Sequence, residues 1–143
     1  MDVTSFSGPY RFLSNFYPVK ITYEGSEYPS VEHAYQAAKT LDLNERKAFQ
    51  DTHLKAGEAK KMGKSVNLRA DWQKVNLSIM ESLVLQKFVE NNALKEALCA
   101  IDGVIIEGNY WGDTFWGESP LGTGENQLGK IIMKVRDILN ESK

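Results

Sequence analysis

One stretch of the sequence carries an acid, an amide and an amine at the spacing of a helix face. Glu32, Gln36 and Lys39 stand at positions i, i+4 and i+7, which lie on one side of a helix. Glu32 and Lys39 would begin about 10.5 Å apart along the helix axis, and the long lysine side chain can close much of that gap. A carboxylate and an amine could therefore flank one small ligand. The alternative is a solvated helix face with two charges and an exposed glutamine.

The two histidines do not extend this group into a metal site. His33 lies about 100° around the helix from Glu32, so we expect a hydrogen-bonded residue at a packing seam. His53 has no acidic or nucleophilic neighbour at a useful spacing. The one cysteine, Cys99, completes no pattern of metal ligands and excludes an internal disulfide. We therefore expect neither a metal nor an organic cofactor.

A second candidate region is the segment 107–129, which is rich in glycine and aromatic residues, including Trp111, Phe115 and Trp116. A loop this long inside a compact domain is usually functional. Aromatic residues on irregular backbone are rarely all core, so we interpret them as walls of a pocket for a flat ligand. The end of the loop, 122–126, could present backbone N–H groups to a phosphate; a plain turn is the alternative.

A third cluster, 68–72, contains Arg69, Asp71 and Trp72. Arg69 could clamp a phosphate or be a surface charge. Asp71 is a good N-cap for a helix that follows. Trp72 is expected in the core or in a pocket wall.

The elements that must position these residues are mostly helices. Residues 19–23 and 27–28 flank a Glu24–Gly25 turn and predict a hairpin. Ser30 is a suitable N-cap for a helix from Val31 to about Thr40. Further helices are predicted over 44–50, 55–62 (ended by Gly63), 72–89 (with Leu77, Met80, Leu83, Val84 and Phe88 inward), 92–100 and 128–139, and a buried strand over 104–106.

Composition limits the class of protein. The chain has 143 residues, 42% hydrophobic and 25% charged, with a mean hydropathy of −0.39, so we expect a single domain over 1–143. A net charge of −2 disfavours bulk nucleic-acid binding but leaves open a pocket for one nucleotide. No signal peptide or membrane span is apparent, so a cytoplasmic location is expected.

Several separated motifs resemble the NADAR superfamily, also called YbiA-like. They lie in the same order and cover nearly the whole chain: 13–18, 30–39, 68–72, Met80 with 87–88, Glu107, 113–117, 124–129, Met133 and Arg136. The spacings Ser-x-Glu-x-x-x-Gln-x-x-Lys and Gly-x-Asn-x-Leu-Gly are specific, whereas Leu-Arg-x-Asp-Trp alone would be weak.

The resemblance implies a compact, mostly helical α+β fold with a small β-sheet and an N-glycosidase activity that needs no cofactor. Glu32 matches the family's essential glutamate and Lys39 its active-site lysine. The resemblance, together with the motifs above, also implies a set of substrate-binding residues. They are Asn15, Phe16, Gln36, Arg69, Trp72, Glu107, Asp113, Trp116, Gly117, Gly124 and Asn126. The associated substrates are ADP-ribosylated guanine, as nucleoside or nucleic acid, and phosphoribosylated aminopyrimidines of riboflavin biosynthesis; we expect the former.

Two mechanisms stay open from the sequence. Glu32 could stabilise an oxocarbenium-like state or shuttle the proton, or a Lys39 amine of lowered pKa could attack the sugar with Glu32 as acid and base. Two other classes also remain: a non-catalytic module that binds ADP-ribose or a nucleotide, and a protein-interaction module that uses the tryptophan-rich loop.

Overall fold

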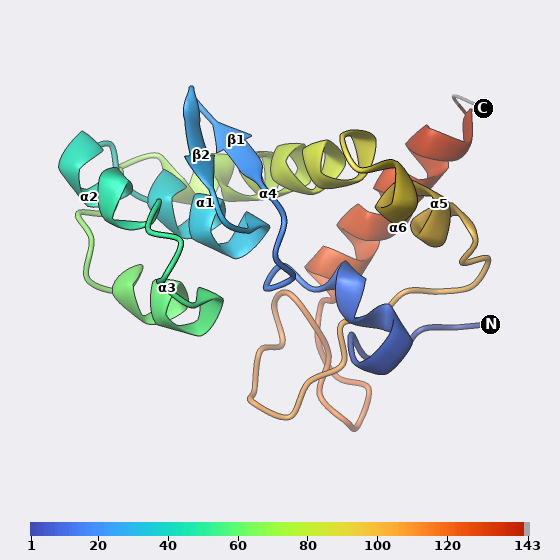
Figure 1. Ribbon diagram of the computed structural model, residues 1–143. Coiled ribbons are helices and arrows are strands. Elements are labelled where there is room, and N and C mark those ends of the chain that lie inside the picture. Colours follow the sequence, from blue (N-terminus) through green and yellow to red (C-terminus); the bar gives the residue numbers. More distant parts are fainter. Residues whose placement is uncertain (142–143) are drawn as a thin grey trace. The chain divides into compact units, whose positions relative to one another are not determined.

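A computed structural model describes residues 1–141, which fall into two compact units (Figure 1). Unit 1 comprises Met1–Ser14 and the chain from Phe88 onward, and unit 2 comprises Asn15–Lys87. Their boundary lies inside helix α4 (Trp72–Val89). Helices dominate both units and one small antiparallel sheet lies in unit 2, which confirms the predicted α+β class.

Unit 2 begins with the predicted hairpin. Strand β1 (Ile21–Tyr23) pairs with β2 (Ser26–Tyr28), with Ile21 opposite Tyr28. Glu24 and Gly25 both have a positive φ, of 47° and 86°. Positive φ at both central residues matches the right-handed twist of the strands, which is why an acidic–glycine pair suits this turn.

Helix α1 (Val31–Ala38) is the buried helix of unit 2. Ser30 caps it, because its Oγ accepts a hydrogen bond from the backbone N–H of His33 at 3.2 Å, as predicted. All eight residues of α1 are buried, and the helix packs against the hairpin, α2 (Leu43–Ala48) and α3 (Ala56–Met62). Because the hairpin, α2 and α3 cover α1 on several sides, this helix has no face exposed to solvent.

The remaining helices of unit 2 lie within two residues of their predicted ends. Asp42 caps α2 by accepting hydrogen bonds from the backbone N–H groups of Asn44 and Glu45. Gly63 ends α3 but has a φ of −61°, so it does not adopt the left-handed conformation that usually favours glycine at a helix end.

Helix α4 has the predicted bounds and buries Met80, Leu83 and Val84. The prediction that Leu77 faces inward is wrong, because its side chain is 39% exposed. Trp72 is the buried residue near the start of the helix. Five residues separate the two positions, about 140° around the axis, so burial of Trp72 leaves Leu77 on the outer side.

Unit 1 contains the 3-10 helix η1 (Gly8–Leu13) and helices α5 (Asn92–Cys99) and α6 (Gln127–Glu141). Helices α5 and α6 pack side by side (Figure 1). The helix predicted over 128–139 is therefore confirmed, and it buries Ile131, Ile132, Val135 and Leu139.

The strand predicted over 104–106 is wrong in extent. Ile105 is fully buried but forms only an isolated parallel bridge with Val3, and Val104 is 46% exposed. The backbone carbonyl of Ile105 instead accepts a hydrogen bond from the Asn126 side chain at 2.9 Å. A side chain therefore takes the place of a second strand partner.

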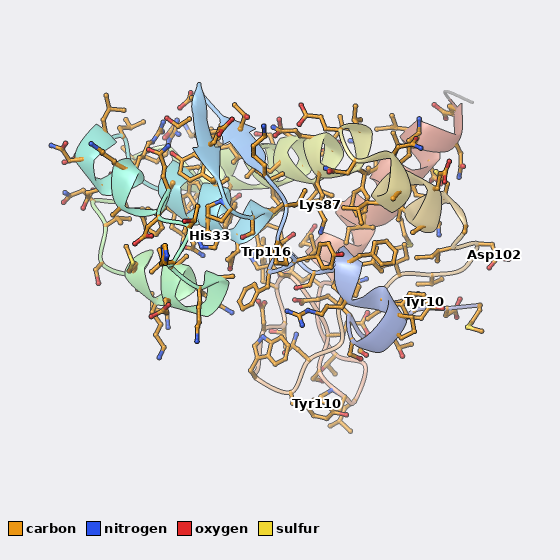
Figure 2. The ribbon with its side chains drawn as sticks, viewed as in Figure 1. Tyr10, His33, Lys87, Asp102, Tyr110 and Trp116 are labelled. Carbon is orange, nitrogen blue, oxygen red and sulfur yellow. The ribbon has the colours of Figure 1, made fainter. Side chains whose placement is uncertain are left out.

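Lys87, on α4, is a fully buried lysine of unit 2 (Figure 2). Its side chain is 1% exposed, and its Nζ lies 5.6 Å from the centroid of the Tyr17 ring. Burial disfavours the charged amine and lowers the pKa of Lys87 to about 7.

Replacing Lys87 by methionine is expected to flatten the pH dependence of stability. The folded pKa, about 7, lies below the ordinary value of 10.5, so the unfolded chain binds more protons between these values. The free energy of unfolding of the wild type should therefore rise with pH in this window, by about 1.4 kcal/mol per pH unit from this group. Below the window both states are protonated and the contribution is constant.

Urea unfolding of the wild type and Lys87→Met between about pH 7 and pH 9 measures this slope. Lys74→Met is the control, because Lys74 is exposed on the same helix. Equal slopes for the wild type and Lys87→Met would contradict the prediction.

Candidate functional site

Glu32, Gln36 and Lys39 lie on α1 and at its C-cap, and the solvated-face alternative is wrong for them. The exposed fractions of Glu32 and Gln36 are 7% and 4%, and Lys39 is half-buried. A carboxylate this deep is usually paired or functional. Glu32 also lies in the first turn of α1, where the positive end of the helix dipole stabilises a negative charge.

The segment before the hairpin is fixed to this first turn. The backbone carbonyl of Asn15 accepts a hydrogen bond from the backbone N–H of Glu32 at 3.0 Å. The Asn15 side chain donates to the sulfur of Met80 at 3.4 Å. Phe16 is 41% exposed beside Gly57 of α3. Both predicted contact residues of this segment therefore lie in the same unit as Glu32.

The other end of α1 is held by Arg69. Its backbone N–H donates to the carbonyl of Lys39 at 2.7 Å, and its Nη1 donates to the carbonyl of Ala38 at 3.4 Å. The Arg69 guanidinium also pairs with Asp71, at 2.6 and 3.1 Å, and lowers the pKa of that carboxyl. Arg69 therefore orients the backbone at Lys39.

Trp72 belongs to the core of unit 2. It is 6% exposed and its ring centroid lies 5.0 Å from that of Tyr35, a residue of α1. Of the two roles that the sequence left open, core packing is the one observed.

The surroundings of Lys39 favour its neutral amine. Burial is the largest cause of its lowered pKa, and the positive charges of Lys60 and Lys64 act in the same direction. Glu32 opposes them by stabilising the charged form. The amine is therefore more available as a nucleophile near neutral pH than an ordinary lysine amine.

Sequence reasoning missed Lys60 and Lys64. The run Lys60-Lys61-Met62-Gly63-Lys64 reads as the end of a solvated helix, and only the packing of α3 on α1 brings two of its charges near Lys39. The four-residue spacing of Lys60 and Lys64, which is that of neighbours on one helix face, was the only signal in the sequence.

His33 has the structural role predicted for it. It is 3% exposed, its Nε2 lies 2.7 Å from the carbonyl of Leu54, and its Nδ1 lies 2.7 Å from Ser30 Oγ. Because a carbonyl only accepts, Nε2 donates, and Nδ1 accepts from the serine hydroxyl in the neutral ring.

Within unit 1, Asn126 holds the start of the glycine-rich loop. Its side chain accepts from the backbone N–H of Glu107 at 3.0 Å and donates to the carbonyl of Ile105 at 2.9 Å. Gly117 packs against Glu107, since a Cβ at Gly117 would lie 2.1 Å from the Glu107 carbonyl oxygen. A Cβ at Gly124 would lie 2.4 Å from the carbonyl oxygen of Gly117. These glycines allow the close approach of three backbone segments.

Asp113 organises the turn that carries Trp116. Its carboxylate accepts hydrogen bonds from the backbone N–H groups of Phe115 and Trp116 at 3.2 and 2.9 Å. The side chain of Asn109 bonds both backbone groups of Asp113. Trp116 is half-buried and meets Phe115 edge to face, at 4.9 Å between centroids. Direct contact of these unit 1 residues with a substrate stays a prediction.

Hydrogen bonds within the chain oppose the phosphate site considered for 122–126. The backbone N–H groups of Glu125, Gln127 and Leu128 donate to loop carbonyls at 2.7–3.0 Å, and that of Asn126 donates at 3.2 Å. The start of α6 therefore already has partners for the N–H groups that a phosphate would need.

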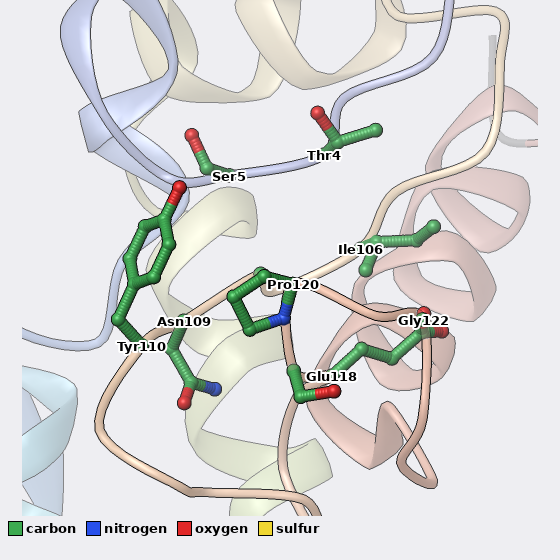
Figure 3. A pocket seen from close by; sticks show the side chains of 10 residues that line it. Thr4, Ser5, Ile106, Asn109, Tyr110, Glu118, Pro120 and Gly122 are labelled. Atoms are coloured by element: carbon green, nitrogen blue, oxygen red, sulfur yellow. The ribbon is translucent and has the colours of Figure 1, made fainter.

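Unit 1 also contains a cavity of about 460 Å³ (Figure 3). Thr4 and Ser5 lie along one side, and Glu118 and Pro120 along another. Tyr110 at its rim is 89% exposed. The walls combine hydroxyls, the Asn109 amide, one carboxylate and apolar surface. Trp111, Phe115 and Trp116 are not among the residues that line the cavity.

Residues 1–141 contain no group of three or more His, Cys, Asp or Glu side chains arranged to hold a metal ion. Within the same range, no helix combines the length and apolar character that crossing a membrane requires.

Comparison with known proteins identifies the family. The NADAR domain matches residues 4–140. The chain belongs to the NADAR domain family. The predicted family is therefore confirmed, and the match includes both units.

Three relatives of this NADAR domain are informative. A riboflavin biosynthesis protein of Vibrio vulnificus is 36% identical over 135 residues, 91% of this chain but only 36% of that protein, so the chain spans about a third of its length. An N-glycosidase of Nostoc punctiforme is 34% identical over 90% of this chain and 85% of its own. N-glycosidase YbiA of Escherichia coli is 31% identical over 94% of this chain and 85% of its own.

The solved structure of the Escherichia coli protein YbiA supports the fold. It matches 99% of this NADAR domain and 85% of its own chain, with a TM-score of 0.85 and 30% identity. The names of two relatives agree with the predicted enzyme class, an N-glycosyl hydrolase.

Proposed function

We propose that the chain is an N-glycosidase that hydrolyses the bond between a base and ribose. The observation that carries the proposal is that α1 and its C-cap place the buried Glu32 carboxylate near the Lys39 amine, whose lowered pKa Glu32 opposes. The relatives named N-glycosidase support it.

Cleavage of a ribosyl C–N bond builds positive charge on the anomeric carbon while the base departs. The neutral amine of Lys39 attacks this carbon as the bond to the base breaks, and Glu32 supplies the proton that the base takes away. The bound ammonium group then gives one proton to the ring oxygen as the bond between that oxygen and the anomeric carbon breaks, which opens the sugar ring. Loss of the second proton from nitrogen leaves an imine, which water hydrolyses to free sugar and lysine. In the other scheme water attacks directly and Glu32 stabilises the cationic state. The lowered pKa of Lys39 favours the first scheme.

The substrate we propose is ADP-ribosylated guanine, as a nucleoside or in nucleic acid. The relative named for riboflavin biosynthesis favours a second candidate, a phosphoribosylated aminopyrimidine. Both substrates carry phosphate, and the charges of Lys60 and Lys64 that act on Lys39 would attract it.

Mass spectrometry of the protein incubated in parallel with ADP-ribosylated guanosine and a phosphoribosylaminopyrimidine tests the proposal. Release of free base from either substrate supports an N-glycosidase and selects between the two. Binding of ADP-ribose without base release would indicate a non-catalytic module, and neither binding nor release would leave the interaction-module alternative.

Replacing Lys64 by glutamine is expected to shift the pH–rate profile to higher pH. Lys64 lowers the pKa of Lys39, so its removal raises that pKa and more alkaline conditions are needed to form the neutral amine. The acidic limb of the kcat profile should move to higher pH while the fold is retained. Lys61→Gln is the matched control, because Lys61 is an exposed lysine of α3, three residues before Lys64. An unshifted Lys64→Gln profile would argue against the free amine as the reacting form.

A further inference from the structure

The side-chain carbonyl of Gln36 is a buried acceptor without a protein partner. Gln36 is 4% exposed, and its Oε1 has no hydrogen-bond partner among the described residues. An unsatisfied buried acceptor destabilises a folded protein. Such a group is retained at a cost in stability, which is typical of a binding site.

Gly63 explains how the amide is accommodated. Its φ of −61° and ψ of −17° are right-handed helical values that any residue adopts. A Cβ at this position, however, would lie 1.8 Å from Gln36 Oε1 and 2.7 Å from its Cδ. A larger residue would therefore displace the Gln36 amide from this position, although the backbone conformation itself would accept it.

We propose that Gln36 Oε1 accepts a hydrogen bond from a hydroxyl of the substrate's ribosyl group, and that Gly63 is the positioning residue that makes room for it. The inference rests on the proposed function, in which Glu32 and Lys39 act at the anomeric carbon. Gln36 lies between them on the same stripe of α1, so the sugar that both reach is the part of the substrate nearest to it. A ribosyl hydroxyl is a donor that a carbonyl oxygen can accept from.

Gln36→Met separates this role from packing, because methionine fills a similar volume but has no carbonyl. Without ligand, the variant should melt at the same temperature as the wild type or roughly 2 °C higher, because an unsatisfied acceptor has gone. Its kcat/KM should fall at least about tenfold, since an enzyme–substrate hydrogen bond has been lost. Unchanged kcat/KM, or a melting temperature that falls together with activity, would overturn the proposal.

Gly63→Ala tests the positioning role. The new methyl group must displace the Gln36 amide, so kcat/KM should fall about as far as in Gln36→Met. If Gly63→Ala alone does not fold, the double variant Gln36→Ala/Gly63→Ala remains decisive. It should melt close to Gln36→Ala, because the nearest remaining atom, Gln36 Cβ at 3.3 Å, needs to move by only a few tenths of an ångström. A lower melting temperature for the double variant would show that Gly63 is needed for another reason.

Gly57→Ala is the matched control, a glycine of the same helix whose added Cβ would meet only Phe16, at the ordinary distance of 3.9 Å. It should keep wild-type kcat/KM. Loss of activity in Gly57→Ala equal to that in Gly63→Ala would contradict a specific role for Gly63.

Thermal shifts with ADP-ribose and with ribose 5-phosphate distinguish failure of this inference from failure of the proposed function. A wild type that releases no base but is stabilised by either compound, with the shift lost in Gln36→Met, rejects the N-glycosidase and supports the contact. A wild type that releases base while Gln36→Met does so equally well rejects the contact alone. Neither turnover nor a shift in the wild type rejects both.

Discussion

Replacement of Glu32 by glutamine is expected to lower turnover at least about 100-fold, the usual scale for a lost general acid or base. Glutamine has nearly the shape of glutamate but cannot exchange a proton with the departing base. Glu32 is 7% exposed in the first turn of α1, so the loss would be chemical and not one of surface charge. Steady-state kinetics on the substrate that releases base measures it.

Two controls accompany this variant. Thermal unfolding of Glu32→Gln should show a retained fold, and Glu27→Gln, on an exposed position of β2, should keep wild-type turnover. Turnover of Glu32→Gln near that of the wild type would remove Glu32 from the mechanism.

Lys39→Arg is expected to be nearly as damaging as Lys39→Ala, with both at least about 100-fold below the wild type in kcat, as expected when a covalent catalyst is lost. Arginine keeps the positive charge but stays protonated and cannot form an imine. If Lys39 only contacted a phosphate or paired with Glu32, arginine would retain substantial activity.

Borohydride trapping tests the same intermediate directly. Reduction during turnover should leave a stable adduct on Lys39, located by peptide mass spectrometry, with the mass of the reduced ADP-ribosyl or phosphoribosyl group of the substrate used. Lys61, an exposed lysine of α3, should carry none. An active Lys39→Arg together with no trapped adduct would exclude the covalent scheme and leave hydrolysis assisted by Glu32.

Local chemistry made several elements predictable. The Glu24–Gly25 turn, the Ser30 cap and the bounds of α4 each depend on residues close in sequence, and the structure reproduces them. The strand over 104–106 failed because pairing depends on a distant segment, and Val3 offers a single bridge.

The sequence predicts which residues of the candidate site share a helix face but not how deeply they are buried. Helical spacing groups Glu32, Gln36 and Lys39, whereas their burial follows from the packing of the hairpin, α2 and α3 around α1, which the spacing within one helix does not reveal. For the same reason the roles of Lys60 and Lys64 became visible only with α3 in place. The N–H groups at the start of α6 looked available because the sequence does not reveal which loop carbonyls return to them.

The division of the chain affects the order in which it can fold during synthesis. Unit 2 is one continuous segment, Asn15–Lys87, whereas unit 1 needs residues from before and after it. A ribosome that has translated as far as α5 has already supplied every residue of the unit that carries Glu32 and Lys39. Val3 must still wait for Ile105, about a hundred residues later, before their bridge can form. The helix with the proposed catalytic residues can therefore become native in the nascent chain while the first fourteen residues are still unpaired with their partners in unit 1.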